Sequence, residues 1–487
     1  MNILKKVLKK YNDIPIAAKA ALWFMICSVL QKSMSLITTP IFTRIMTTTQ
    51  YGQFTVYNSW LQIFIILTTF RLNFAVFSKG MSKYKDDRDG YTSTMQSITF
   101  ILAIVVFIIY LIFRNQINAI IELPTFIIVA MFIELLVFPA IDFWTIRKRY
   151  EYIYKPVVFR TLLMTVLNAV VGVIAVLISE EKGYARIMSC VLVNFCFGLI
   201  LFVYNRKKGK VWLNKEYVKF AVFFNIPLLP HYFSQYVLDQ FSKIMIQKMV
   251  SVAVAGIYGV AYNLGMLMKI VTQIIINAIT PWQYDKLEKK QFKELDDVTF
   301  LIIAFVTGCA LAFSSLAPEI MVVLADERYH EAMYAVPPIA LGIVFSFVYT
   351  LYANIEFFYD KNKFTMYISM AVAVLNVALN YIGLKLFGYL AAAYATLLCY
   401  MLFAFGHYVY VTWIIKRKFG IDKVFNSKRL IILSVAVVAL SIFMAFFYNY
   451  MLIRYAIIFA ALIVLFVNRK KLISALKMTK SAKKSKN

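Results

Sequence analysis

The chain has few residues of the kinds that disulfide frameworks, metal centres and catalytic sites require. Its 487 residues include five cysteines and three histidines. The cysteines all lie within apolar runs at spacings that fit neither a disulfide framework nor a zinc site, which predicts small core residues at Cys27, Cys190, Cys196, Cys309 and Cys399. Walker, phosphate-loop, HExxH and nucleophile-elbow patterns are also missing from the sequence. We therefore predict no catalytic residues, no metal and no cofactor other than a coupling proton or sodium ion.

Acidic residues are also scarce. The chain has 24 Asp and Glu and 52 Lys and Arg, so its net charge is +28. Such an excess can indicate nucleic-acid binding, but here most basic residues lie in the two tails and the even-numbered loops between apolar runs. The odd-numbered loops hold only Arg44, Arg114, Lys182, Lys243, Lys248, Arg328, Lys385 and Arg454. By the positive-inside rule both termini are predicted to be cytoplasmic. The basic tail, residues 469–487, is then a lipid-attracted segment rather than a nucleic-acid arm, so membrane lipids are expected partners and nucleic acid is not.

Long polar stretches are rare, since 62% of the residues are hydrophobic and the mean hydropathy is +0.73. Apolar runs long enough to cross a bilayer recur from end to end, whereas the alternating segments of a β-barrel do not. We count 14 runs, near residues 17–46, 52–78, 92–113, 123–145, 156–179, 184–204, 216–239, 251–283, 298–318, 333–355, 364–386, 388–414, 430–448 and 452–468. This pattern predicts an all-α polytopic membrane protein.

The chain is weakly similar to itself when it is shifted by 204 residues. The coinciding pairs are Arg44 with Lys248, Gly52 with Gly256, Val56 with Val260, Thr68 with Thr272 and Asn73 with Asn277. The register carries through six predicted helices, so we expect two parallel six-helix bundles around a central cavity, over residues 1–210 and 211–418. Two additional transmembrane helices follow over residues 419–468. Gly52 and Gly256 are expected in tight outer turns. Chance similarity of two apolar hairpins is the alternative.

Two stretches resemble one family of membrane carriers. The first is "KAALWFMICSVLQKSMSLITTPIFTRIMTTTQYGQF", residues 19–54, and the second is "NIPLLPHYFSQYVLDQFSKIMIQKMVSVAVAGIYGVAYNL", residues 225–264. Together they resemble the polysaccharide-transporter branch of the multidrug/oligosaccharidyl-lipid/polysaccharide exporter superfamily, which includes the Wzx-type O-antigen flippases. The resemblance implies a flippase that moves an undecaprenyl-diphosphate-linked oligosaccharide across the bacterial plasma membrane by alternating access. It also implies a polysaccharide polymerase and a chain-length regulator as partners.

Cations within the apolar runs are candidates for binding an anionic substrate, because a charge near the bilayer centre usually faces a cavity or a partner. Lys32 and Lys269 lie near the middle of their runs, and Gln273 and Asn277 continue the polar face of Lys269. A lysine binds phosphate as a mobile point charge, which suits a diphosphate that must later leave. Pairing of each lysine with a carboxylate is the alternative. Arg71, Arg160, Arg186 and Lys219 lie closer to helix ends, from which they can snorkel; the first two are also substrate candidates.

Two further ionisable residues and two prolines lie deep in the runs. Glu134 is central in its run and is expected to be protonated and inert, to pair with Lys32, or to carry a coupling proton. His231 is a second coupling candidate. It follows Pro230, and Pro227 lies three residues earlier. Because proline removes a backbone hydrogen bond, these two prolines are expected to break the helix, either as a hinge or as a static kink.

The resemblance also implies a cation site. Lipid-carrier members of the superfamily can be driven by a cation bound among helices 7, 11 and 12, and the matching positions here are Asp239, Asn376, Asn380 and Thr396. One carboxylate with amides is a weak cage for a hard cation. Sodium coupling is therefore doubtful, and a proton-driven or gradient-driven cycle is at least as well supported.

Two rival functions follow from the same sequence. A cation-coupled multidrug antiporter of this superfamily would share the twelve-helix core, although cationic drugs favour acidic pockets over lysines. A membrane enzyme would need a large outer loop or a cluster of catalytic groups, and His231, His330 and His407 are scattered. Transport of a lipid-linked saccharide is the function that the sequence favours.

Overall fold

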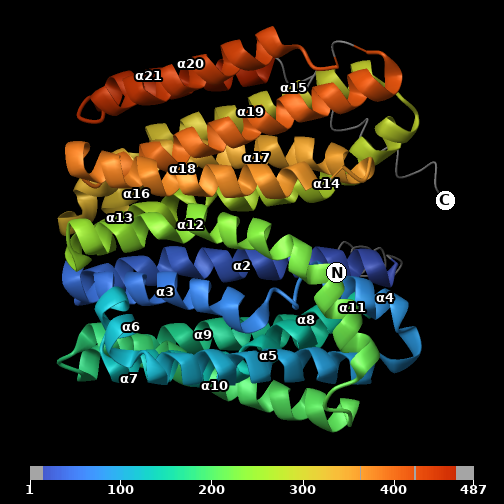
Figure 1. Ribbon diagram of the computed structural model, residues 1–487. Helices are drawn as coiled ribbons and strands as arrows, with labels where there is room; N and C mark the ends of the chain where they lie inside the picture. Colours follow the sequence, from blue (N-terminus) through green and yellow to red (C-terminus); the bar gives the residue numbers. More distant parts are fainter. Residues whose placement is uncertain (1–14, 362, 422–423, 468–487) are drawn as a thin grey trace, which may run out of the picture. The chain divides into compact units, whose positions relative to one another are not determined.

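The computed structural model describes residues 15–361, 363–421 and 424–467, and these residues form helices without any strand (Figure 1). The α-helices of the first half are α2 (Ile16–Ile45), α3 (Thr48–Thr69), α4 (Ala75–Lys83), α5 (Arg88–Ile112), α6 (Arg114–Ile121), α7 (Thr125–Val137), α8 (Pro139–Tyr150), α9 (Lys155–Ile178), α10 (Lys182–Gly209) and α11 (Lys215–Asn225). Those of the second half are α12 (Leu229–Met249), α13 (Val252–Gly265), α14 (Met268–Glu288), α15 (Phe292–Ser315), α16 (Ala317–Leu324), α17 (Val336–Phe358), α18 (Lys363–Phe387), α19 (Ala391–Phe419), α20 (Ser427–Phe446) and α21 (Met451–Val467). Short 3₁₀ segments are η1 (Lys85–Asp87), η2 (Ile226–Leu228) and η3 (Glu327–Ala335).

Eleven helical stretches of the described residues are long and apolar enough to cross a membrane. The predicted all-α polytopic membrane class is confirmed. Three of the 14 predicted runs are not among the eleven. They correspond to α3, to the interrupted α11 and α12, and to α21, which has 17 residues.

The chain divides into two compact units, Met1–Phe233 and Ser234–Asn487, which we call the N-terminal and C-terminal units. In the N-terminal unit α10 packs against α9, α7, α5 and α3. In the C-terminal unit α19 packs against α17 and α18, and α15 packs against α17 and α20. The bundle boundaries predicted at residues 210 and 418 remain predictions.

The 204-residue repeat is visible in where the helices begin and end. Helix α2 ends at Ile45 and α12 at Met249, and α3 begins at Thr48 where α13 begins at Val252. The same offset relates Arg88, the first residue of α5, to Phe292, the first residue of α15. These matches make chance similarity an inadequate explanation of the repeat.

Both units start the second helix of the repeat with the same kind of cap. In the N-terminal unit the Thr47 hydroxyl accepts a hydrogen bond from the backbone N–H of Gln50, whose side chain accepts one from the Thr47 N–H. In the C-terminal unit the hydroxyl of Ser251, 204 residues later, accepts from the N–H of Val254. Each cap satisfies a backbone donor that a helix start leaves without an intrahelical partner.

These caps also correct one expectation. Gly52 and Gly256 do not lie in tight turns, because each helix has begun before its glycine and both residues are helical and buried. In each unit the turn ends at the residue whose hydroxyl caps the helix, and the glycine follows inside the helix.

Apart from run 216–239, where a break was expected, three predicted runs are interrupted well inside their bounds. Run 52–78 is interrupted between α3 and α4, where Phe70 and Arg71 adopt positive φ angles of 44° and 55°. Run 123–145 is divided between α7 and α8 at Phe138, which precedes a proline at the start of α8. Run 251–283 is divided after Gly265, where a Cβ would overlap Ile339 of α17. Hydrophobicity alone does not register such interruptions, because the residues on both sides are equally apolar.

The predicted break at the two prolines is present. Pro227 lies in η2, a single 3₁₀ turn between α11 and α12, and Pro230 lies in the first turn of α12. The break comes just before the division of the two units. Helix α11 belongs to the N-terminal unit, where the Tyr217 hydroxyl donates to Asp87 at 2.8 Å and the Asn225 amide donates to the Phe70 carbonyl.

The last helix, α21, is attached to α15 and α16 by an ion pair and backbone contacts. Arg454 Nη1 lies 2.6 Å from Glu319 Oε2 and 2.9 Å from the Ser315 carbonyl oxygen. Burial raises the pKa of the Glu319 carboxyl, but the hydrogen bonds that it accepts from Arg454, the backbone and Tyr455, together with the charge of Arg454, outweigh that effect, so the pKa is lower than usual. The carboxylate is therefore charged at neutral pH, and this attachment weakens only as the pH falls towards that lowered value.

Candidate functional site

Three arginines gather around one carboxylate in the N-terminal unit, and we call them the arginine cluster: Arg71, Arg149 and Arg160, around Asp142 of α8. Each arginine interacts electrostatically with Asp142. The carboxylate also accepts a hydrogen bond of 2.6 Å from the Asn73 amide. With three guanidinium groups and one carboxylate, the cluster has an excess of positive charge.

Different elements hold the three arginines. Arg71 lies in the turn between α3 and α4, and its guanidinium carbon is 5.0 Å from the ring centre of Phe74. Arg149 is exposed at the end of α8. Arg160 of α9 donates to Thr145 Oγ1 at 2.6 Å. The structure thus brings two predicted substrate residues, Arg71 and Arg160, to one carboxylate.

Glu134 lies elsewhere in the same unit, fully buried on α7. One carboxyl oxygen accepts a hydrogen bond from the Tyr57 hydroxyl at 2.9 Å and the other accepts from the Asn194 amide at 2.7 Å. Both partners are neutral donors. The placement of the Lys32 side chain on α2 lies outside what the structure describes, so pairing with Glu134 is still a prediction.

In the C-terminal unit, one carboxylate faces two lysines. Lys269 Nζ of α14 lies 3.3 Å from Asp239 Oδ2 of α12, and Tyr400 donates to Asp239 Oδ1 at 2.9 Å. Lys243, one turn after Asp239, is buried, interacts electrostatically with Asp239 and Lys269, and lies 4.1 Å from the ring centre of Tyr262. Pairing of Lys269 with a carboxylate, the alternative left open by the sequence, is therefore present.

A small cavity adjoins this group. Its volume is about 20 Å³, enough for one water molecule, and its lining includes Asp239, Lys269 and Thr396. From there a polar network continues into α18. The Thr396 hydroxyl lies 3.4 Å from the Asn376 amide, and Asn380 donates to Asn376 Oδ1 at 3.0 Å. Of the four residues suggested for a cation, Asn376, Asn380 and Thr396 are thus joined by hydrogen bonds. Asp239 lines the same cavity as Thr396 but is already paired with a lysine.

The other predicted residues are less connected. Gln273 and Asn277 are exposed on α14 and bond to each other at 3.1 Å. The polar face predicted for Lys269, Gln273 and Asn277 lies on one helix, α14. His231 is partly exposed in the first turn of α12, next to Tyr232.

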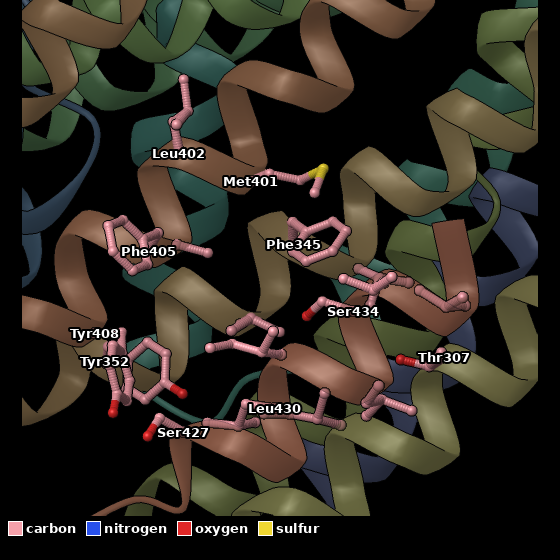
Figure 2. A pocket seen from close by; sticks show the side chains of 18 of the residues that line it. Thr307, Phe345, Tyr352, Met401, Leu402, Phe405, Tyr408, Ser427, Leu430 and Ser434 are labelled. Atoms are coloured by element: carbon pink, nitrogen blue, oxygen red, sulfur yellow. The ribbon is translucent and has the colours of Figure 1, made fainter. Parts of the chain in front are cut away.

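A larger cavity lies in the C-terminal unit among α15, α17, α19 and α20 (Figure 2). Its volume is about 320 Å³, at the lower end of the roughly 300–1,000 Å³ of ligand pockets. The lining is almost entirely apolar, with few hydroxyls. Figure 2 shows Thr307, Phe345, Tyr352, Met401, Leu402, Phe405, Tyr408, Ser427, Leu430 and Ser434 around it. Helix α20, the first of the two additional helices, supplies one wall.

Sequence reasoning missed several of these residues. Asp142 lies within a predicted apolar run, so an ionisable residue in such a run was the available signal. Lys243 was assigned to an outer loop because α12 extends further than the predicted run. Asn73 was noted only as the repeat partner of Asn277, and Tyr400 carried no distinguishing signal, since aromatic residues are frequent in these helices.

The apolar spans, the two repeat-related units and the buried charged groups define a polytopic helical membrane protein. The family model described as "Polysaccharide biosynthesis protein" matches residues 17–285, more than half of the chain. The chain therefore belongs to the polysaccharide biosynthesis protein family. A second family model, MatE, matches residues 227–382.

One curated relative is similar over part of its length. It is Lsg locus putative protein 1 of Haemophilus influenzae, 23% identical over 200 residues, which are 40% of this chain and 50% of that protein. The chain thus matches about half the length of this relative.

Solved structures establish the fold. The lipid II flippase MurJ in an inward closed conformation is 13% identical, with a TM-score of 0.66 over 93% of this chain and 100% of that chain. An inward-facing multidrug resistance MATE family transporter of the MOP superfamily is 12% identical, with a TM-score of 0.59 over 79% of this chain and 95% of that chain. The resemblance to this superfamily seen in the sequence is confirmed.

Proposed function

We propose that the protein is a flippase that moves an undecaprenyl-diphosphate-linked oligosaccharide, such as an O-antigen or capsule repeat unit, to the outer face of the bacterial inner membrane. Membership of the polysaccharide biosynthesis protein family is the observation that carries this proposal. The fold shared with a lipid II flippase is consistent with it. A polysaccharide polymerase and a chain-length regulator are the expected partners that receive the product.

Charged groups of both units are suited to the diphosphate. Arginine binds phosphate oxygens through a planar fork of donors, and the arginine cluster offers three such forks against one carboxylate. In the C-terminal unit Asp239 has two lysines, so Lys269 can leave it for an anion while Lys243 stays. The Lys269 side chain is 39% exposed, whereas Lys243 is buried. Lys32, in the N-terminal unit, is assigned the same role on sequence grounds.

The lipid part of such a substrate needs an apolar surface. The cavity in Figure 2 has that character, and α20 closes one side of it. We assign it to a segment of the polyprenyl chain. This assignment gives α20, the first of the two additional helices, a use that drug transport would not require.

The proposal is tested by export of lipid-linked glycan in a strain that lacks the native gene. Arg160→Gln is expected to lower export at least about tenfold, since hydrogen bonds to charged groups contribute about 1.5–3 kcal/mol. Lys155→Gln, which removes an exposed cation from the start of the same helix, is the matched control and should export normally. Normal export by Arg160→Gln at equal membrane levels would remove the arginine cluster from the substrate site.

Cation-coupled multidrug antiport is the second candidate, and the MatE match over residues 227–382 favours it. It makes a different prediction for cells. An antiporter lowers the accumulation of cationic dyes in a host that produces the protein and leaves glycan export unchanged. A flippase restores glycan export and leaves dye accumulation unchanged.

A further inference from the structure

A buried acid–base pair of the C-terminal unit lies outside the sites described above. Glu356 is on α17 and His407 is on α19, and both side chains are 0% exposed. His407 Nδ1 lies 2.6 Å from Glu356 Oε1. The other carboxyl oxygen accepts a hydrogen bond of 2.9 Å from Thr365 Oγ1 of α18. This one pair therefore joins three helices of the unit.

The second ring nitrogen of His407 is the exchangeable position of the pair. Nε2 is buried and has no hydrogen-bond partner among the described residues. The ring lies among aromatic side chains, with centre distances of 4.7 Å to Phe403, 5.5 Å to Tyr349 and 5.9 Å to Phe364. Nδ1 and the carboxyl group share one proton across their short contact. A second proton can be added or removed only at Nε2.

The net charge of the pair determines when the Nε2 proton can leave. With Nε2 protonated the pair is neutral, whichever of Nδ1 and Oε1 holds the shared proton. When the Nε2–H bond breaks and the proton leaves to water, the pair has a net charge of minus one. An isolated negative charge is strongly disfavoured in so apolar an environment. Release therefore requires water to reach the pair, which means that α17, α18 and α19 must separate locally.

We propose that the Glu356–His407 pair is a proton-binding site, loaded and unloaded at His407 Nε2, and that its proton exchange drives the carrier cycle. The second half of this statement rests on the proposed function. The site differs from Asp239, whose carboxylate is paired with Lys269. It also differs from Glu134, whose partners are neutral.

The other described groups near the pair do not gain or lose a proton at neutral pH. Tyr349 of α17 packs on the His407 ring, and Tyr410 of α19 interacts electrostatically with Glu356. Both are phenols, which stay neutral at neutral pH. Helix α18 contributes Thr365 and Phe364, neither of which is ionisable.

The chain has only three histidines, so a direct measurement on the full protein is practical. Purified protein labelled with ¹⁵N-histidine is followed by nuclear magnetic resonance as the pH is raised, with His407→Gln to assign the signal and His330→Gln as the matched control. We expect the His407 Nε2 signal to change from the protonated to the unprotonated form. A His407 signal that stays constant over the whole pH range in which the wild-type protein is folded would overturn the site, whatever the variants do.

Glycan export with an imposed proton gradient tests the driving step. We expect wild-type export to rise with the gradient, and export by His407→Gln to lose that dependence while His330→Gln, which leaves the pair and its hydrogen bonds in place, keeps it. A titrating His407 in the wild type together with unchanged gradient dependence in His407→Gln would overturn the driving step. Absence of glycan export by the wild type would instead refute the proposed function, and the titration would still decide the proton site.

Discussion

The two units begin and end several helices at corresponding residues, but they carry different charged residues on those helices. Helices α2 and α12 end 204 residues apart, and a hydroxyl caps the helix that follows each. Asp239 and Lys243 of α12 nevertheless correspond to Ser35 and Thr39 of α2. The helix ends are matched because capping and turn geometry tolerate few side chains, whereas one helix face can carry very different polar groups.

The cations also differ in kind between the units. The N-terminal unit gathers arginines around Asp142, and the C-terminal unit places lysines around Asp239. Arginine is always charged and binds oxygens through a fixed planar fork, whereas lysine is a compact charge on a flexible stem. An anion is therefore expected to leave the lysine group more readily than the arginine cluster.

Among the tests of this comparison between the units, the test of membrane topology has the largest expected effect, because each position is either labelled or not labelled. If the repeats are parallel, Gln116 and Arg328 face outward while Lys207 and Lys290 face the cytoplasm. All four are exposed in the structure. Single cysteines at these positions, in a background without the native cysteines, are probed in intact cells with an impermeant thiol reagent. Labelling of position 207 from outside would overturn the fourteen-span model.

Substitution of the more exposed lysine is expected to have the next largest effect. Lys269→Gln should lower glycan export at least about tenfold, or roughly 1.4 kcal/mol, because the anion loses its mobile partner. Lys269→Arg should rescue export in part, since it retains the charge with a different shape. The double variant Asp239→Asn with Lys269→Gln distinguishes the two roles. Recovery of export in the double variant would mean that the ion pair is structural.

The proline break tests whether the two units move as separate bodies. Replacing Pro227 and Pro230 with Ala restores backbone donors and favours a continuous helix from α11 into α12. We expect export to slow severalfold while membrane insertion is unchanged. Wild-type rates in the double variant would identify the break as a static kink. Transport rate and membrane level are measured on the same cells.

The buried carboxyl of the N-terminal unit is expected to affect stability more than transport. Glu134→Leu leaves the donors of Tyr57 and Asn194 without an acceptor, each at a cost of about 1–3 kcal/mol. A lower unfolding temperature in detergent is therefore expected. Glu134→Gln should be milder, because the Tyr57 hydroxyl can reverse its role, and should export normally. Failed export by a stably folded Glu134→Gln would instead make Glu134 a coupling residue.

The two caps give the smallest effect and the most direct comparison of the repeats. Thr47→Ala and Ser251→Ala should each destabilise their unit by about 1 kcal/mol, since each removes one side-chain acceptor at a helix start. Unfolding temperatures in detergent measure both. A loss confined to one variant would show that the caps are equivalent in position only.

Much of the fold follows from the sequence, because apolar runs of spanning length leave few alternatives in a bilayer. The repeat also follows, since the 204-residue register predicted from five residue pairs reappears in the helix ends. The interruptions at Phe70, Phe138 and Gly265 do not follow from hydrophobicity. They depend on positive φ angles, a proline and a close approach of Ile339, none of which changes how apolar the run is.

The candidate site was predictable in three of its cations but not in their partners. Arg71, Arg160 and Lys269 are conspicuous as charges in apolar runs. Their contacts with Asp142 and Asp239 join positions that are distant in sequence, so spacing along one helix cannot reveal them. The Glu356–His407 pair was missed for the same reason, because its members lie 51 residues apart on different helices.

Helix α11 has a consequence for how the protein is made. The buried cluster at the end of the N-terminal unit, which includes Phe77, Tyr91 and Phe143, also includes Tyr217 and Ala221 of α11. Domains fold from the N-terminus as the chain emerges during synthesis. Release of a fragment that ends at residue 210 would leave this cluster without its last helix, and the Asp87 carboxylate without the hydroxyl of Tyr217. A ribosome must therefore deliver the first half of the seventh predicted span before the first unit can close, so a stable half-protein should end near residue 233.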